Sequence, residues 1–166
     1  AVGFTTASGL LAQAGCRLVY DESRDLYRAD RLVEGYRAAG SVNGTFDVEA
    51  CAREGRLAGE VAAEGTGGGS IDLSPADTVV PARRPPVGKK AFVCLCEDVT
   101  EQDLFDAVAE GFSNIETLKR YSTVCMGPCQ GKMCQASSID ACARANGASI
   151  AETGRTTARP PDQPVP

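Results

Sequence analysis

A stretch rich in glycine and proline, GTGGGSIDLSPADTVVPARRPPVGKK, occupies positions 65–90 of this 166-residue chain. Its run of three glycines and its four prolines exclude a stable helix and disfavour a strand, because proline lacks an N–H donor and glycine loses the most entropy on folding. We therefore predict two small folded regions, at 1–64 and 91–150, joined by this linker. A proline-rich connector is expected to follow at 151–166.

The front region, 1–64, has the pattern of an α/β segment. RLVYDESRDLYRADR at 17–31 contains two β-prone runs around a polar turn and predicts a hairpin. VEGYRAAGSV at 33–42 predicts another strand. FDVEACAREGRLAGEVAA at 46–63 predicts a helix with Asp47 as its N-cap. Four apolar side chains are expected near one face of this helix: Val48, Cys51, Leu57 and Val61.

The second region, 91–150, is expected to be mainly helical. AFVCLCEDV at 91–99 predicts an extended segment. Thr100 and Ser113 are each followed three residues later by an acid, which is the pattern of a capping box at a helix start. A third helix is expected from about 131 to 146, with Gly147 just after its end.

Composition limits the possible functions. The net charge is −5 and the basic residues are scattered, which argues against nucleic acid as a partner. The apolar runs are too short to span a bilayer, so no membrane partner is expected. No secretory signal is visible, which favours a cytoplasmic protein. The missing initiator methionine and the proline-rich end suggest a piece of something larger. Without histidine, and with Asp and Glu on predicted solvent faces, no catalytic residue is assigned.

Five of the eight cysteines lie between positions 94 and 134. In a strand, Cys94 and Cys96 would point to the same face, about 6.5–7 Å apart at Cα. Cys129 and Cys134 have room for a loop between them, and a helix N-terminus near Cys134 would favour an anionic group. Two pairs of thiolates suit an iron–sulfur cluster.

Other interpretations of the thiols remain open. Structural zinc usually takes pairs spaced C-x2-4-C, and a redox disulfide favours C-x-x-C. Small buried thiols without a ligand role are the expected state of the isolated Cys16, Cys51 and Cys142. Cys125 is surplus to a four-thiolate centre, and the Gly-Pro corner that follows it is expected to turn it away from Cys129.

The segment from VCLCEDVTEQ to VCMGPCQGKMC, at 93–134, resembles the bacterioferritin-associated-ferredoxin type of [2Fe–2S] module. Its C-Q-G-K-x-C ending resembles the module in α subunits of the sarcosine oxidase and opine- or proline-dehydrogenase-like flavoenzyme family. The resemblance implies four cluster ligands, Cys94, Cys96, Cys129 and Cys134, with Cys125 extra to the pattern.

The front region resembles the closing part of the dinucleotide-binding domain of the same family, through VGFTTASGLLAQAG and YRAAGSVNGTFDVEACAREGRLAG. The resemblance implies dinucleotide contacts at Gly40, Ser41, Val42 and Asn43. Ser41 stands where the family often carries an acid. The G-x-G-x-x-G phosphate loop is not in this sequence, so FAD or NAD is expected to bind only within the complete domain.

These inferences define the expected function. The resemblance implies the electron-transfer [2Fe–2S] portion of a multi-subunit flavin-dependent amine or imino-acid oxidoreductase, with other subunits or domains of the complex as partners. The alternative is an assembly module in which a metal centre staples a core too small to fold alone.

Overall fold

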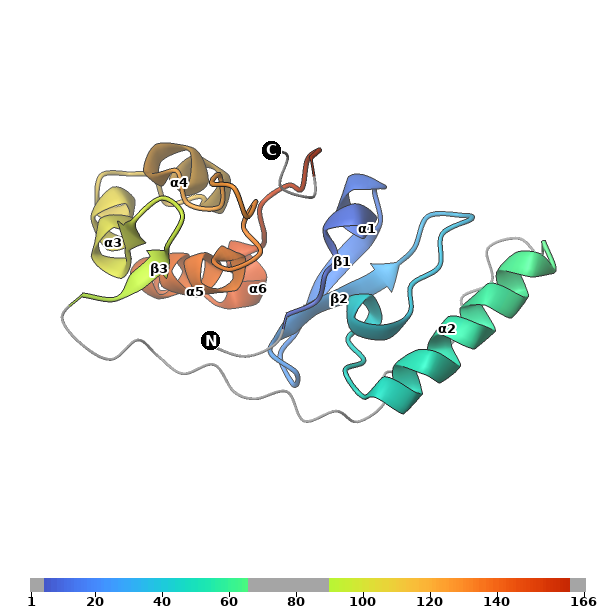
Figure 1. The fold of residues 1–166 in the computed structure, drawn as a ribbon. Coiled ribbons are helices and arrows are strands. Elements are labelled where there is room, and N and C mark those ends of the chain that lie inside the picture. Colours follow the sequence, from blue (N-terminus) through green and yellow to red (C-terminus); the bar gives the residue numbers. More distant parts are fainter. Residues whose placement is uncertain (1–4, 66–89, 162–166) are drawn as a thin grey trace. The chain divides into compact units, whose positions relative to one another are not determined.

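The computed structural model describes residues 5–65 and 90–161, which fall into two compact units, one on either side of the proline- and glycine-rich stretch (Figure 1). Both contain helices and strands, so the chain is mixed α/β. The predicted linker lies almost wholly outside the described residues. No helix in the described ranges is long and apolar enough to cross a membrane.

The front unit contains a hairpin and a long helix. Its elements are α1 (Gly9–Gln13), β1 (Arg17–Asp21), β2 (Leu26–Arg31), the 3-10 helix η1 (Gly40–Asn43) and α2 (Val48–Ala63). β1 and β2 pair antiparallel, which confirms the predicted hairpin. Leu11, Cys16 and Ala38 form a small buried apolar cluster.

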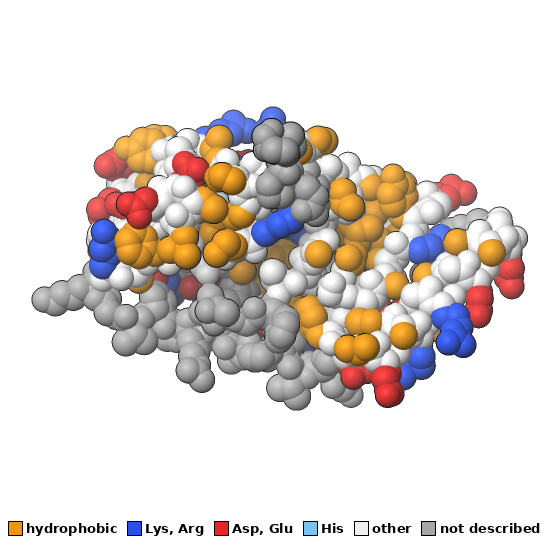
Figure 2. Space-filling view, viewed as in Figure 1, with side chains coloured by type: hydrophobic (Ala, Val, Ile, Leu, Met, Phe, Trp, Pro, Cys, Tyr) orange, Lys and Arg blue, Asp and Glu red, His pale blue; other side chains and the backbone are white. Residues whose placement is uncertain are grey.

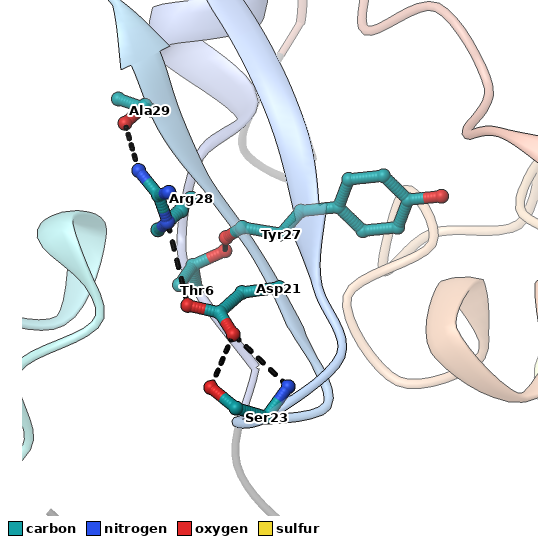
Figure 3. Close-up of polar contacts among 6 residues, drawn as sticks. All are labelled: Thr6, Asp21, Ser23, Tyr27, Arg28 and Ala29. Carbon is teal, nitrogen blue, oxygen red and sulfur yellow. Dashed lines mark hydrogen bonds and ion pairs between the residues drawn. The ribbon is translucent and has the colours of Figure 1, made fainter. Parts of the chain in front are cut away.

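Polar contacts set the turn of this hairpin (Figure 3). Asp21 accepts hydrogen bonds from the backbone N–H and the hydroxyl of Ser23, at 3.0 and 2.6 Å, and pairs with Arg28 at 3.3 Å. The Thr6 hydroxyl donates to the carbonyl of Tyr27 on β2, so the segment before α1 is tied to the outer strand.

The predicted strand at 33–42 is wrong. The segment turns at once, since the Tyr36 N–H donates to the Val33 carbonyl, and it ends in η1. Gly35 and Gly40 have φ of 84° and 70°, and this left-handed conformation breaks an extended run.

The helix after this segment was predicted correctly, with one revision to its buried face. Asp47 caps α2 by accepting from the Ala50 N–H. The buried residues of α2 are Ala50 and Glu54, whereas Val48 is 81% exposed. Figure 2 shows acidic and basic side chains along the outer surface of α2, as expected for a helix with one solvated face.

The second unit packs helices around a short strand pair. Its elements are β3 (Phe92–Cys94), β4 (Val99–Thr100), α3 (Glu101–Ala109), α4 (Ile115–Ser122), α5 (Gln135–Asn146) and α6 (Ile150–Thr153). α3 packs against both α4 and α5. The largest fully buried apolar side chains are Leu104, Leu118, Val124 and Ile139.

The helix starts in this unit were predicted with mixed success. The capping box of Thr100 and Asp103 is confirmed. The one predicted at Ser113 is wrong, because Asn114 is the N-cap of α4 and accepts from the Glu116 N–H. α5 begins at Gln135 rather than near 131, and Gly147 ends it in the left-handed conformation.

Candidate metal centre

The first pair of clustered thiols lies on the connection between β3 and β4. Cys94 is the last residue of β3 and is 1% exposed, whereas Cys96 lies in the turn at 95–98 and is exposed. The extended arrangement expected for both cysteines is therefore wrong for Cys96. Burial raises the pKa of the Cys94 thiol, opposed by hydrogen bonds from the N–H groups of Glu97 and Cys96 to its sulfur.

The other three thiols lie in the loop between α4 and α5, which folds as consecutive tight turns. The Met126 N–H donates to the Thr123 carbonyl, and the Gln130 N–H donates to the Gly127 carbonyl. Thr123, Cys125 and Gln130 all have positive φ, between 53° and 65°. Because L-residues other than Asn and Asp rarely adopt this conformation, the loop holds a backbone shape that its tertiary contacts must support.

Two glycines allow the thiol-bearing loops to approach closely. A Cβ on Gly127 would lie 2.6 Å from Cβ of Cys96 and 2.7 Å from a carboxylate oxygen of Glu97. A Cβ on Gly131 would lie 3.1 Å from Cβ of Cys125. Position 127 therefore excludes every larger side chain unless the turn at 95–98 moves away.

The tertiary structure pairs the predicted ligands across the two loops. Cys96 and Cys129 share a side-chain hydrogen bond, and Cys94 and Cys134 share another. Cys134 is fully buried and Cys94 nearly so, whereas the Cys96–Cys129 pair is the more exposed one. The four sequence-predicted cysteines are thus brought together as a buried pair and an outer pair.

The surroundings of the outer pair favour a thiolate. Burial opposes ionisation of Cys129, but hydrogen bonds from the N–H of Met133, from the Cys96 thiol and from the N–H groups of Gly131 and Lys132 outweigh it and lower the pKa of the Cys129 thiol. Backbone N–H groups directed at sulfur are also the donors that stabilise the anionic core of an iron–sulfur cluster.

The buried pair includes a neighbour that was expected to face elsewhere. Cys125 is 6% exposed, and its sulfur accepts a hydrogen bond from the Cys134 thiol at 3.6 Å. Donation to Cys125, together with burial, raises the pKa of Cys134 far above its usual value. The same hydrogen bond lowers the pKa of Cys125.

The donor set was tested for its fit to a metal group. Within residues 5–65 and 90–161, no three His, Cys, Asp or Glu side chains already surround one metal position. What the loops present is two pairs of thiols supplemented by N–H donors, which fits a centre of two irons with two thiolates each better than a single ion with four ligands.

The candidate dinucleotide residues lie in the front unit. Gly40, Ser41, Val42 and Asn43 form η1, and the Gly40 N–H donates to the buried carboxylate of Glu54 at 2.7 Å. The fully buried Thr45 hydroxyl donates to the other oxygen of Glu54.

Sequence reasoning missed Glu54, which it placed among solvated acids. Its spacing of four from Ala50, the small residue of the buried face of α2, was the available signal. Glu54 holds η1 in place and is the only buried acid among the described residues.

Comparison with known proteins places the chain. Residues 88–166 match the family model of the sarcosine oxidase A3 domain. The chain is 32% identical to the alpha subunit of sarcosine oxidase from Rhizobium meliloti, over 98% of this chain and 17% of that protein. It is 31% identical to an opine oxidase subunit of Rhizobium meliloti, over 56% of this chain and 18% of that protein.

A solved structure shares the fold. L-proline dehydrogenase from P. horikoshii superposes with a TM-score of 0.74 and 20% identity, over 98% of this chain and 36% of that one. These findings confirm the resemblance seen in the sequence: the chain belongs with the α subunits of the sarcosine oxidase and opine oxidase family. It spans about a sixth of the length of those curated relatives.

Proposed function

We propose that the second unit is the [2Fe–2S] module of a multi-subunit, flavin-dependent amine or imino-acid oxidoreductase. The observation that carries the proposal is the pairing of four thiols across two loops, Cys94 with Cys134 and Cys96 with Cys129. When bound, the cluster would supply one-electron transfer. Substrate oxidation would occur at a flavin in another domain or subunit, consistent with the absence of an acid or base positioned for catalysis among these thiols.

The residues of this chain would do three things for the cluster. The four thiolates would bind it, with the buried pair at one end and the outer pair at the other. The N–H groups around Cys94 and Cys129 would offset its negative charge. The packed helices α3 and α5 would keep water from the buried end.

For the front unit we propose the closing part of a FAD- or NAD-binding domain. The support is the turn at Gly40–Asn43, which Glu54 and Thr45 hold in a fixed conformation. The proposed boundaries are 1–64 for this part, 65–90 for the linker, 91–150 for the cluster module and 151–166 for the connector.

Anaerobic purification tests the proposal. We expect about two irons and two sulfides per chain, absorption above roughly 400 nm, and reversible one-electron reduction. Stoichiometric zinc without visible absorption would replace the proposal with the structural role of a metal staple. A bound cluster that cannot be reduced reversibly would also favour that role.

A further inference from the structure

A fifth thiol, Cys125, belongs to the buried end of the candidate centre although a [2Fe–2S] cluster needs only four. Its sulfur lies 3.6 Å from that of Cys134. Two sulfurs bound to one tetrahedral metal ion at about 2.3 Å are about 3.8 Å apart. Cys125 therefore lies where a ligand of the same metal ion would lie, next to Cys134 and within electrostatic reach of Cys94.

The local backbone is shaped to present this thiol. Cys125 has φ of 65°, a conformation that glycine adopts without strain and cysteine does not. Gly131 lies so close that a Cβ there would approach Cβ of Cys125 to 3.1 Å and its sulfur to 3.4 Å. The loop thus accepts strain at position 125 and gives up a side chain at 131 to seat a buried sulfur beside Cys134.

A hydrogen-bond chain holds Cys125 when it is not a ligand. The Ser138 hydroxyl donates to the Gln135 carbonyl at 2.9 Å, so its single proton is committed. The Ser138 oxygen, 3.5 Å from the Cys125 sulfur, is left to accept the Cys125 thiol proton. Cys134 donates to Cys125 in turn, which leaves Cys125 poised between a neutral thiol and a metal ligand.

We propose that Cys125 is a reserve ligand that replaces Cys134 at the buried end of the metal centre. The exchange is not a redox step. The Cys125 thiol releases its proton to solvent as its sulfur binds the metal, and the Cys134 thiolate takes up a proton as its own bond to the metal breaks. The proposal rests on the proposed function, because it presumes a thiolate-bound centre.

The outer pair provides the matched control. Among the described residues, no hydrogen bond links Cys129 to a thiol other than Cys96, itself an expected ligand. We therefore compare Cys134→Ala with Cys129→Ala in the whole chain, purified anaerobically and assayed for iron, sulfide, visible absorption and the EPR spectrum of the reduced protein.

We expect Cys134→Ala to retain iron within about twofold of the wild type, with a shifted spectrum, and Cys129→Ala to lose at least about tenfold. The double variant Cys134→Ala with Cys125→Ala should lose iron as Cys129→Ala does. Equal loss in Cys134→Ala and Cys129→Ala would overturn the proposal.

Two further variants exclude simpler explanations. Cys134→Ser keeps the size of the side chain, so a colourless but folded Cys134→Ser protein would overturn the proposal without a packing defect as its cause. If Cys134→Ser with Cys125→Ala still binds iron, the serine oxygen is the ligand and the proposal is also wrong.

Failure of the proposed function gives a different result. It would appear as a wild type that lacks the cluster. If that wild type carries zinc, the same ratios read as zinc per chain decide whether Cys125 is a reserve ligand. A wild type without any bound metal would overturn both proposals.

Discussion

The two units of this chain are held together in different ways. In the front unit the apolar cluster is small, and the buried acid Glu54 joins α2 to η1 and to Thr45 through hydrogen bonds. In the second unit Leu104, Leu118 and Ile139 are fully buried, and the thiol-bearing loops close over one side of this core. The front unit therefore depends on a satisfied polar group, and the second on packing and on the thiol centre.

Removing a ligand should give the largest contrast between the units. We expect serine at Cys94, Cys96 or Cys129 to abolish the visible absorption and to reduce helical content, because metal binding is coupled to folding in so small a core. Cys125→Ser should keep the cluster, since four thiolates remain. Iron per chain and circular dichroism measure both effects, and a bleached Cys125→Ser beside a coloured Cys129→Ser would refute the ligand assignment.

A methyl group at Gly127 should have the next largest effect. Its Cβ would meet Cβ of Cys96 at 2.6 Å, so the turn at 95–98 must move and the outer pair is pulled apart. We expect Gly127→Ala to lose most of its iron. Gly59→Ala is the control, because nothing lies within 4 Å of Cβ there, and it should stabilise α2 by about 0.5–1 kcal/mol. Full iron occupancy in Gly127→Ala would contradict the close approach of the loops.

Changing the buried acid should affect the front unit alone. Glu54→Gln keeps the shape but replaces one acceptor with a donor that faces the Gly40 N–H or the Thr45 hydroxyl, at a cost of about 1–3 kcal/mol. Urea unfolding followed by tyrosine fluorescence measures this cost, and iron per chain should not change. Glu60→Gln, on the exposed face of α2, is the matched control. A fall in iron with Glu54→Gln would mean that the units are not independent.

The smallest expected effect is the pH dependence of the hairpin. The Ser23 hydroxyl, donating to Asp21, holds the pKa of that carboxyl below its usual value. A lowered pKa in the folded state adds stability that is present above the usual value near 4 and is lost as the pH falls through the folded one. A carboxyl-carbon NMR titration should find the pKa of Asp21 raised in Ser23→Ala, and an unchanged pKa would show that this contact does not persist in solution.

Local sequence signals predicted much of the fold because their causes are local. The hairpin at 17–31, the Asp47 cap and the Thr100 capping box each depend on residues within a few positions of one another, and all three are confirmed. The family resemblance was readable for a similar reason, since the spacing of four cysteines is written along one short segment.

Only the tertiary structure decided how distant groups meet. It moved the start of α4 to Asn114 and turned the segment at 33–42 away from a strand, because no partner strand is present among the described residues of that unit. It buried Glu54 against η1, and it set Cys125 against Cys134 rather than turning it away. Backbone conformation at residues such as Cys125, and contact between loops, depend on what packs around them, and short-range patterns carry no record of that packing.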